Sequence, residues 1–291
     1  MAKRKDKFWF ALFTVPLLFI FTTVVIIPFI MGIYYSFFQW NGMPANPKIF
    51  NGLKNYAELF QDHRFLISSL HTVEFTAMAV TLVNLLGFIF ALLVSSKLRG
   101  TKTSRTLFFM PNLIGGLILG YIWQFIFTKG FEILGKTTGL HDLFFAWLLH
   151  PNDALFATVI VFTWQMAGYT MVIYLAGIQG IPSEMIEAAK VDGANSWQRL
   201  RKVVFPLLMP SFTICLFLTL AEAFKIYDVN LSLTGGGPGH STELLAMNIY
   251  NEIFSYGHYG YGQAKAVAFF IVVATITLTQ VYITKKREVQ L

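Results

Sequence analysis

The sequence is poor in charged side chains and in cysteine. Asp, Glu, Lys and Arg make up 13% of its 291 residues, whereas a soluble domain carries about 25%. The single cysteine, Cys215, excludes a disulfide within these residues, so no covalent cross-link shapes the fold. Hydrophobic residues make up 55% of the chain, and this composition is typical of a protein that lies in a membrane.

The hydrophobic residues are gathered into six stretches without a charged side chain. These stretches are residues 8–47, 75–96, 106–128, 154–183, 203–221 and 266–284. The shortest two hold 19 residues, and a helix needs about 20 residues to cross a bilayer. We therefore predict an all-α membrane protein with six transmembrane helices. The first stretch is longer than the hydrophobic region of a signal peptide, which has about 7–15 residues, so we expect it to remain as the first span.

Lysine and arginine are divided unevenly among the segments that join these stretches. If the N-terminus is cytoplasmic, the cytoplasmic segments hold 15 of the 22 basic residues, namely Lys3, Arg4, Lys5, Lys7, Lys97, Arg99, Lys102, Arg105, Lys190, Arg199, Arg201, Lys202, Lys285, Lys286 and Arg287. Cytoplasmic segments of membrane proteins carry such an excess, so both termini are predicted to be cytoplasmic. The same bias accounts for the net charge of +7, which therefore gives no reason to expect a nucleic acid as partner.

One short string, "GFEILGKT" at residues 130–137, matches the pattern of a phosphate-binding loop. Such a loop follows a buried strand, whereas this string follows a membrane stretch and is expected in an exposed, glycine-rich turn on the outer face. We interpret the match as chance, and we expect neither ATP hydrolysis nor a cofactor on this chain. The six histidines show no metal-ligand spacing, and no nucleophile and base can be paired into a catalytic site.

The cytoplasmic segment at residues 179–205 is longer than a connector between two spans needs to be. Its string "IPSEMIEAAKVDGANSWQRLRKVVFP" predicts a helix, a break at Asp192-Gly193, and a second short helix capped by Asn195 or Ser196. We interpret this helix–turn–helix of small and charged residues as a docking element for another protein. A solvated connector is the alternative.

This segment resembles the signature loop of ABC-transporter permeases, in which Glu-Ala-Ala is followed by a glycine and later by Leu-Pro or Phe-Pro. The matching residues are Glu187, Ala188, Ala189, Asp192, Gly193, Ala194, Phe205 and Pro206. The strings "FFMPNLIGGLILGYIWQFIF", "YLAGIQGIP" and "LTGGGPGHSTELLAMNIYNEIF" further resemble the carbohydrate-uptake branch, which includes the maltose and glycerol-phosphate permeases, and the likeness covers about residues 8–285. His71-Thr72 departs from the Asn-Thr usual in that branch.

The resemblance implies one permease domain over residues 1–291 with the fold of a type I ABC importer. Its first span lies at about 8–38, its six-span core at about 71–284 and its coupling loop at about 179–205. It implies that the chain is a transport subunit rather than an enzyme, with ATP hydrolysed on two separate cytoplasmic ATPase subunits. A sister permease and an extracellular solute-binding protein would complete the importer. The loop residues Glu187, Ala188, Ala189, Asp192 and Gly193 would dock on an ATPase.

The implied substrate is a sugar or oligosaccharide, carried across the cell membrane in which the chain is surrounded by lipid. A glycerol-phosphate ester or other small solute is the nearest alternative, and a secondary transporter is a more distant one. The register of maltose-type permeases places five residues along the cavity: Trp164, Gln165, Tyr169, Thr219 and Glu222. Aromatic faces, amides and carboxylates are the groups that bind sugars.

Each of these assignments has a structural alternative. Trp and Tyr near the ends of spans often form an interfacial belt, and Gln165 has the chemistry to bond a neighbouring helix. Glu222 has Lys225 three residues away, and Lys225 has Asp228, so the three are able to form a ladder of ion pairs. In the third stretch Gly116-x-x-x-Gly120 predicts close packing between helices.

Overall fold

The computed structural model describes residues 2–96 and 100–288, with side chains from Trp9 onward. Lys97 and Arg99, which we assigned to a cytoplasmic segment, lie outside the described residues. The chain divides into two compact units, Met1–His63 with Ile249–Ile271 and Arg64–Asn248 with Val272–Leu291.

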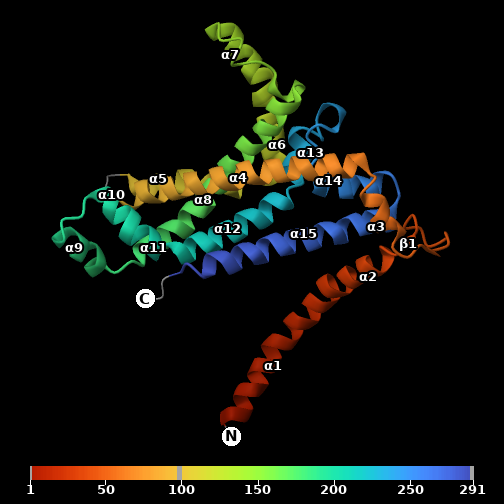
Figure 1. Ribbon diagram of the computed structural model, residues 1–291, viewed down its shortest axis with the longest axis horizontal. Helices are drawn as coiled ribbons and strands as arrows, with labels where there is room; N and C mark the ends of the chain where they lie inside the picture. Colours follow the sequence, from red (N-terminus) through yellow and green to blue (C-terminus); the bar gives the residue numbers. More distant parts are fainter. Residues whose placement is uncertain (1, 97–99, 289–291) are drawn as a thin grey trace. The chain divides into compact units, whose positions relative to one another are not determined.

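The Met1–His63 and Ile249–Ile271 unit contains the first span and a small hairpin. Its elements are α1 (Ala2–Phe21), a π turn (Thr22–Ile26), α2 (Ile27–Tyr35), β1 (Phe38–Gln39), β2 (Ile49–Phe50), α3 (Lys54–Leu59), a π turn (Asn251–Ser255) and the first part of α15 (Tyr259–Lys285). In Figure 1, α1 and α2 form one long bent helix. From Trp9 onward its side chains are mostly apolar and exposed, which suits a helix surrounded by lipid. Strands β1 and β2 pair antiparallel, with Phe38 opposite Phe50.

The Arg64–Asn248 and Val272–Leu291 unit holds a bundle of long helices. Its elements are α4 (His63–Ser95), α5 (Thr101–Phe109), a 3-10 turn (Met110–Leu113), α6 (Gly116–Phe125), a π turn (Ile126–Gly130), α7 (Phe131–Thr138), a 3-10 turn (Trp147–Leu149), α8 (Pro151–Gln179), α9 (Ser183–Val191), α10 (Ser196–Arg199), a π turn (Leu200–Val204), α11 (Phe205–Leu207), α12 (Met209–Phe224), α13 (Asp228–Leu233), a 3-10 turn (Pro238–His240), α14 (Leu245–Tyr250) and the end of α15. Helices α4, α8 and α12 lie side by side at the centre of this unit (Figure 1). Gly87 of α4 leaves room for Thr170 of α8 at this contact.

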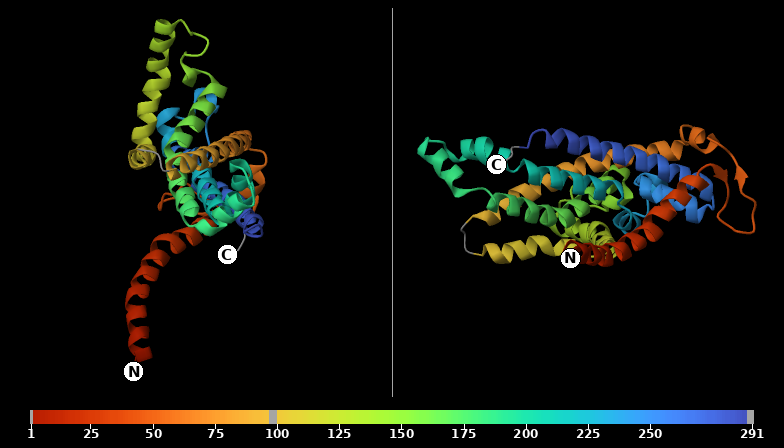
Figure 2. Two further views of the ribbon diagram at one scale, coloured as in Figure 1. Left: turned by 90° about the vertical axis from the view of Figure 1, so that its left-hand side faces the viewer. Right: turned by 90° about the horizontal axis from the view of Figure 1, so that it is seen from below.

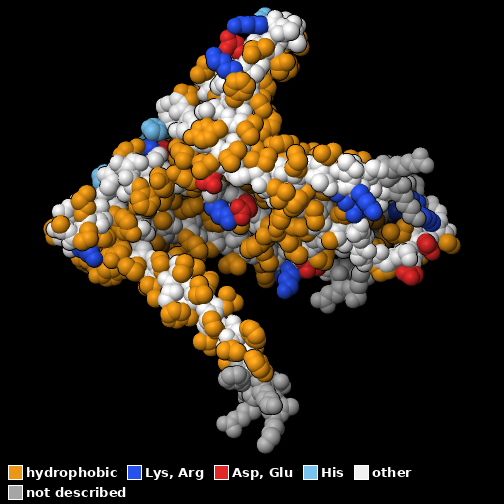
Figure 3. All heavy atoms as spheres, turned by 180° about the vertical axis from the view of Figure 1, so that it is seen from behind, with side chains coloured by type: hydrophobic (Ala, Val, Ile, Leu, Met, Phe, Trp, Pro, Cys, Tyr) orange, Lys and Arg blue, Asp and Glu red, His pale blue; other side chains and the backbone are white. Residues whose placement is uncertain are grey.

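The described residues contain five helices that are long and apolar enough to cross a membrane. A sixth span results if the bent pair Ser196–Leu207 and Met209–Phe224, whose parts meet at 67°, is taken as one. The bend falls at Leu208 between Pro206 and Pro210, which lack the N–H groups that a straight helix requires. Hydrophobic side chains also predominate on the face drawn in Figure 3. These findings agree with the predicted six-span, all-α membrane protein.

The third span differs from the prediction in its position. The charge-free stretch at 106–128 predicts one helix, but the chain leaves the helical conformation at Ile114, with φ −83° and ψ 125°. The candidate span runs instead over Gly116–Thr138. It includes the string "GFEILGKT", which is helical throughout: Gly130 has a helical φ of −59° at the N-cap of α7, and the remaining residues belong to α7. Our prediction of an exposed turn at this string is therefore wrong. The segment before the string is a helix, whereas a phosphate-binding loop follows a strand, so the string lacks the structural setting of such a loop.

The predicted packing role of the third span's glycines is confirmed. A Cβ on Gly116 would lie 2.8 Å from Cβ of Asp228, and one on Gly120 would overlap Oγ of Ser232. Both partners belong to α13, so the two glycines let α6 and α13 approach at backbone distance.

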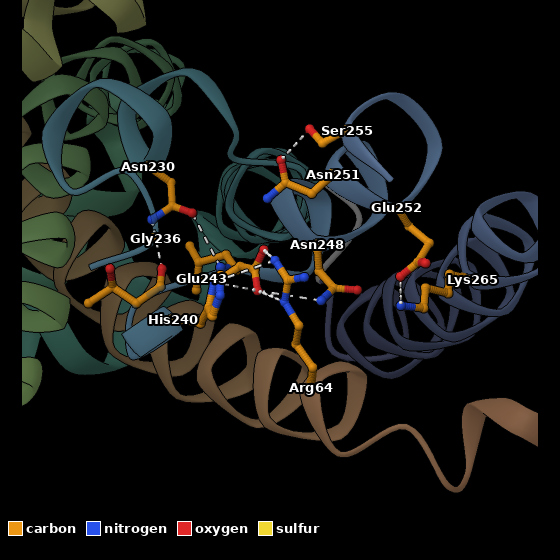
Figure 4. Close-up of polar contacts among 12 residues, drawn as sticks. Arg64, Asn230, Gly236, His240, Glu243, Asn248, Asn251, Glu252, Ser255 and Lys265 are labelled. Atoms are coloured by element: carbon orange, nitrogen blue, oxygen red, sulfur yellow. Dashed lines mark hydrogen bonds and ion pairs between the residues drawn. The ribbon is translucent and has the colours of Figure 1, made fainter. Parts of the chain in front are cut away.

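The glycine-rich segment after α13 interrupts the α-helices, and an ion pair just beyond it fixes it to α4 (Figure 4). Gly235, Gly236 and Gly237 all have positive φ, which favours glycine. Beyond them, Arg64 of α4 donates from Nε to Oε2 of Glu243 at 2.7 Å and from Nη2 to Oε1 at 2.5 Å. The Glu243 side chain has no exposed surface. Such a two-point contact holds the loop in one place.

Candidate functional site

A cavity of 460 Å³ lies within the Arg64–Asn248 unit, between α6, α8, α12 and the link that precedes α13. Its lining includes Gln165 and Tyr169 of α8 and Glu222 of α12. The structure thus brings together three of the five residues that the resemblance implied for substrate. Phe162 and Met166, one helical turn from these positions on α8, form the apolar part of the same wall.

Gln165 has a structural partner within the cavity wall. Its Nε2 donates to the backbone carbonyl of Ile114 at 3.0 Å. Because Ile114 is extended, its carbonyl lies outside the helical hydrogen-bond pattern, and Gln165 supplies the missing donor. Gln165 therefore bonds a neighbouring segment, as one alternative foresaw, while its side chain still lines the cavity.

Glu222 pairs with Lys225 at 2.8 Å between Oε1 and Nζ. Their side chains are 46% and 63% exposed, so water reaches both. The first step of the predicted ladder is therefore present. The second step of the ladder is absent, because among the described residues Lys225 and Asp228 form no ion pair. Asp228 is nevertheless one of the residues that line the cavity.

Trp164 and Thr219 lie away from the cavity lining. Trp164 is 42% exposed and packs edge-on against Trp123, with 5.5 Å between ring centroids. Thr219 has no exposed surface. It accepts a hydrogen bond from Nδ2 of Asn84 at 2.9 Å and donates to the carbonyl of Cys215 at 2.7 Å. Both hydrogen-bonding functions of Thr219 are thus used between and within spans.

The structure adds two polar side chains that sequence reasoning did not assign to the site. Asn112 lines the cavity from the 3-10 turn before α6, where its Nδ2 donates to Sδ of Met166 at 3.5 Å. Asp228 lines it from the first turn of α13. The string "FFMPN" signalled Asn112, because a proline inside a span breaks the helix and frees the next side chain for another role.

The cavity combines amide, carboxylate, ammonium and aromatic groups. Two carboxylates, Glu222 and Asp228, face one cation, Lys225, which is already paired. The described lining contains no arginine to hold a phosphate in the bidentate manner. The arrangement suits a neutral ligand with many hydroxyl groups. Among the described residues, no group of three His, Cys, Asp or Glu side chains is placed to hold a metal ion.

The segment between α8 and α12 forms an exposed helix–turn–helix at the end of the bundle (Figure 2). Helix α9 ends at Val191, and Gly193 turns the chain with a φ of +77°. Asn195 then caps α10: its Oδ1 accepts from the Gln198 backbone N–H at 2.9 Å, and Oε1 of Gln198 accepts from the Asn195 N–H at 2.8 Å. The predicted break and the predicted cap at Asn195, rather than Ser196, are confirmed.

The predicted docking residues lie on the surface of this loop. Ala189 is half-buried, and the others are exposed: Glu187, Ala188, Asp192 and Gly193. Sequence reasoning missed the apolar side chains beside them. Val191 is 88% exposed and Trp197 67% exposed. An exposed tryptophan and valine next to small residues form a surface suited to another protein.

Two helices that line the cavity are also the two that enter and leave this loop. Helix α8 carries Gln165 and Tyr169 and ends at Gln179, and α12 begins at Met209 and carries Glu222. A helical membrane protein with a polar cavity and an exposed helix–turn–helix between two of its lining helices has the architecture of a solute permease. The chain belongs to the family of binding-protein-dependent transport system inner membrane components, whose model matches residues 83–288.

Relatives and solved structures agree with this assignment. The chain is 48% identical over 295 residues to the probable starch degradation products transport system permease protein AmyD of Thermoanaerobacterium thermosulfurigenes, with 100% of both chains covered. It is 32% identical to the multiple sugar-binding transport system permease protein MsmF of Streptococcus mutans, with 99% of both covered. A crystal structure of a bacterial ABC transporter that imports the acidic polysaccharide alginate matches at a TM-score of 0.83, with 18% identity and 98% of both chains covered. At that identity the likeness shows a shared fold, and it confirms the predicted ABC importer permease fold.

Proposed function

We propose that this chain is the membrane permease subunit of an ATP-driven importer for a sugar or oligosaccharide. The observation that carries the proposal is that α8 runs unbroken from the cavity to the exposed loop, while α12 joins the loop through α11 and the bend at Leu208. A push on the loop therefore reaches two walls of the cavity, one directly through α8 and one through the bent pair. This is how a separate energy source can open a site alternately to the two sides of a membrane.

The string at 130–137 follows a helix and not a strand, so we assign ATP hydrolysis to separate ATPase subunits that bind the loop at 179–205. We place this loop and both termini in the cytoplasm, on the distribution of Lys and Arg. A second permease chain and an extracellular solute-binding protein complete the proposed assembly. The alginate transporter has been crystallised in complex with an alginate pentasaccharide-bound periplasmic protein, which supports this arrangement. Residues 1–291 act as one permease domain.

The proposed substrate class follows from the cavity and the relatives together. Two of the relatives are named for starch degradation products and for multiple sugars. The cavity offers Gln165, Tyr169 and Glu222 to sugar hydroxyls and ring faces. A glycerol-phosphate ester fits less well, because the lining offers it only Lys225, which already pairs with Glu222. A secondary transporter fits less well too, since it has no use for a docking loop.

The test is a charge reversal on the docking loop. Glu187→Lys replaces an exposed carboxylate of α9, and we expect it to abolish sugar uptake by the reconstituted importer and to weaken association with the ATPase subunits. Glu132→Lys is the matched control, because it makes the same change on exposed α7 away from the loop and should leave uptake nearly normal. Normal uptake by Glu187→Lys, at wild-type levels of inserted protein, would falsify the docking role.

A further inference from the structure

A second cavity, of 700 Å³, lies within the Met1–His63 and Ile249–Ile271 unit. It is enclosed by the β1–β2 hairpin, α3 and the segment that leads into α15. Its volume falls within the range of about 300–1,000 Å³ that is usual for small-molecule sites. The transport cycle proposed above makes no use of it.

The wall of this cavity beneath the hairpin is fixed by a buried amide. Asn55 is 3% exposed, and its Nδ2 donates to the backbone carbonyls of Ser36 at 2.8 Å and Phe38 at 3.1 Å. Its Oδ1 accepts from Nδ2 of Asn51 at 3.1 Å. Gly260 at the start of α15 adds to this rigidity, since any Cβ there would overlap the carbonyl oxygen of Phe38. The cavity is therefore built in advance of any ligand.

Five of the fifteen lining residues carry amide side chains: Gln39, Asn41, Asn46, Asn51 and Asn55. Each amide donates through its NH₂ and accepts through its oxygen, and a sugar hydroxyl also does both. The side chains of Gln39 and Asn46 form no hydrogen bond with the rest of the described chain. They are therefore available to a ligand.

The carboxylates of the lining each lie beside a lysine. Glu58 pairs with Lys54 at 3.8 Å, while Asp62 and Glu252 share the buried ammonium of Lys265 at 2.8 and 2.5 Å (Figure 4 shows the Glu252 contact). Lys265 has no exposed side-chain surface. Because three carboxylates share two ammonium groups, the site does not favour an anionic ligand. Its carboxylate oxygens still serve as hydrogen-bond acceptors.

Two aromatic side chains, Trp40 and Tyr261, complete the lining. Their polar atoms are directed to protein partners: Nε1 of Trp40 donates to the Met43 carbonyl at 2.9 Å, and the Tyr261 hydroxyl donates to Oδ2 of Asp62 at 3.0 Å. Because these polar atoms already bond protein groups, the two rings present apolar surface to a ligand. Apolar ring faces beside amides and carboxylates match a sugar, which has C–H faces and a rim of hydroxyls.

We propose that this cavity is a second saccharide-binding site, separate from the transport cavity. Its ligand is a neutral oligosaccharide of the kind that the permease carries, and in this respect the inference rests on the proposed function. In the proposed topology the hairpin and α3 are extracellular, so the site receives sugar before it enters the membrane.

The permease in lipid nanodiscs, without the solute-binding protein, is titrated with maltotriose and maltohexaose, whether or not they are taken up. An alginate trisaccharide is the anionic control and should not bind. Trp40 reports on the site, because the sugar-induced change in tryptophan emission should disappear in Trp40→Phe. The double variant Gln39→Ala, Asn46→Ala should bind about tenfold more weakly, which corresponds to about 1.4 kcal/mol. Gln61→Ala, an exposed amide of the same unit outside the lining, is the matched control and should bind normally.

Three results overturn this site. They are the absence of an emission change with both neutral sugars, unchanged affinity in the double variant, and loss of the Trp40 signal in Gln165→Ala, which alters the transport cavity. If the double variant keeps its sugar affinity and loses binding of the solute-binding protein in a separate assay, the cavity is a protein-docking site instead. Failure of uptake with every sugar refutes the proposed function instead, and the emission titration still decides this site by itself.

Discussion

At the scale of single residues, the Glu222–Lys225 pair shows why contact alone does not assign a role. Both side chains are about half exposed. Ion pairs that water can reach contribute about 0–1 kcal/mol to stability, because solvent screens them. The pair is therefore dispensable for the fold, and Glu222 is able to exchange Lys225 for a ligand at small cost.

A double-mutant cycle separates the two roles of Glu222. A carboxylate that bonds a sugar hydroxyl contributes about 1.5–3 kcal/mol, so Glu222→Gln should lower the uptake rate about tenfold or more. Lys225→Met removes the screened pair and one lining ammonium but keeps the Glu222 carboxylate, so it should lower uptake less than about fivefold. The measurement is the uptake rate in vesicles that hold the assembled importer. Equal losses in both single variants, with no further loss in the double variant, would assign Glu222 to the structure instead.

The sequence located part of the site and misplaced the rest for physical reasons. Gln165, Tyr169 and Glu222 were found because helical register puts them on the right faces of two spans. Helical register does not reveal which polar side chains form hydrogen bonds with a neighbouring span. Thr219 was misassigned to the cavity for this reason, since it bonds Asn84 of α4. Asn112 was not predicted, because the charge-free stretch at 106–128 indicated one unbroken helix, whereas Asn112 lies in a 3-10 turn within it.

At the scale of elements, the contact between α5 and α8 depends on a glycine. A Cβ on Gly168 would overlap the carbonyl oxygen of Phe108 and lie 2.9 Å from Cα of Phe109. These are backbone atoms, so the overlap is relieved only by moving a helix. Gly130, by contrast, is helical, and a Cβ there would meet nothing closer than 3.8 Å.

Gly168→Ala should therefore destabilise the protein by about 1–3 kcal/mol or more, which lowers the Tm by about 5 °C or more for a chain of this size. Gly130→Ala is the matched control and should leave stability unchanged or raise it by up to about 1 kcal/mol, because alanine favours a helix. Unfolding can be followed in detergent with a thiol-reactive fluorophore, since Cys215 is fully buried until the bundle opens. An unaltered Tm in Gly168→Ala would show that α5 is not packed on α8 in solution.

The spans themselves were largely predictable, and the breaks within them were not. Length and lack of charge identify the stretches because lipid imposes both. They do not say where a helix stops, and the third span was displaced because Pro111 and the extended Ile114 interrupt the stretch at 106–128. The bend of 67° at Leu208 has the same origin, since Pro206 and Pro210 mark it in the sequence without fixing its angle.

At the scale of the whole molecule, the topology decides what each site can do. The loop at 179–205 serves an ATPase only if it is cytoplasmic, and the hairpin cavity meets incoming sugar only if it is extracellular. Both conditions are predicted from the Lys and Arg residues, 15 of 22 of which lie on one side in the proposed topology. One measurement of sidedness therefore bears on both proposals.

The chain is well suited to that measurement because its single cysteine, Cys215, has no exposed surface and should not react in the folded protein. New cysteines at two exposed positions, His141→Cys before α8 and Ser183→Cys at the start of α9, then act as the reporters. In right-side-out membrane vesicles, a membrane-impermeant maleimide should label His141→Cys at once, and Ser183→Cys only after permeabilisation. The wild-type chain, treated in the same way, sets the background from Cys215. Labelling of Ser183→Cys in sealed vesicles would invert the topology, place the docking loop out of reach of ATP and remove the basis for an ATPase partner there.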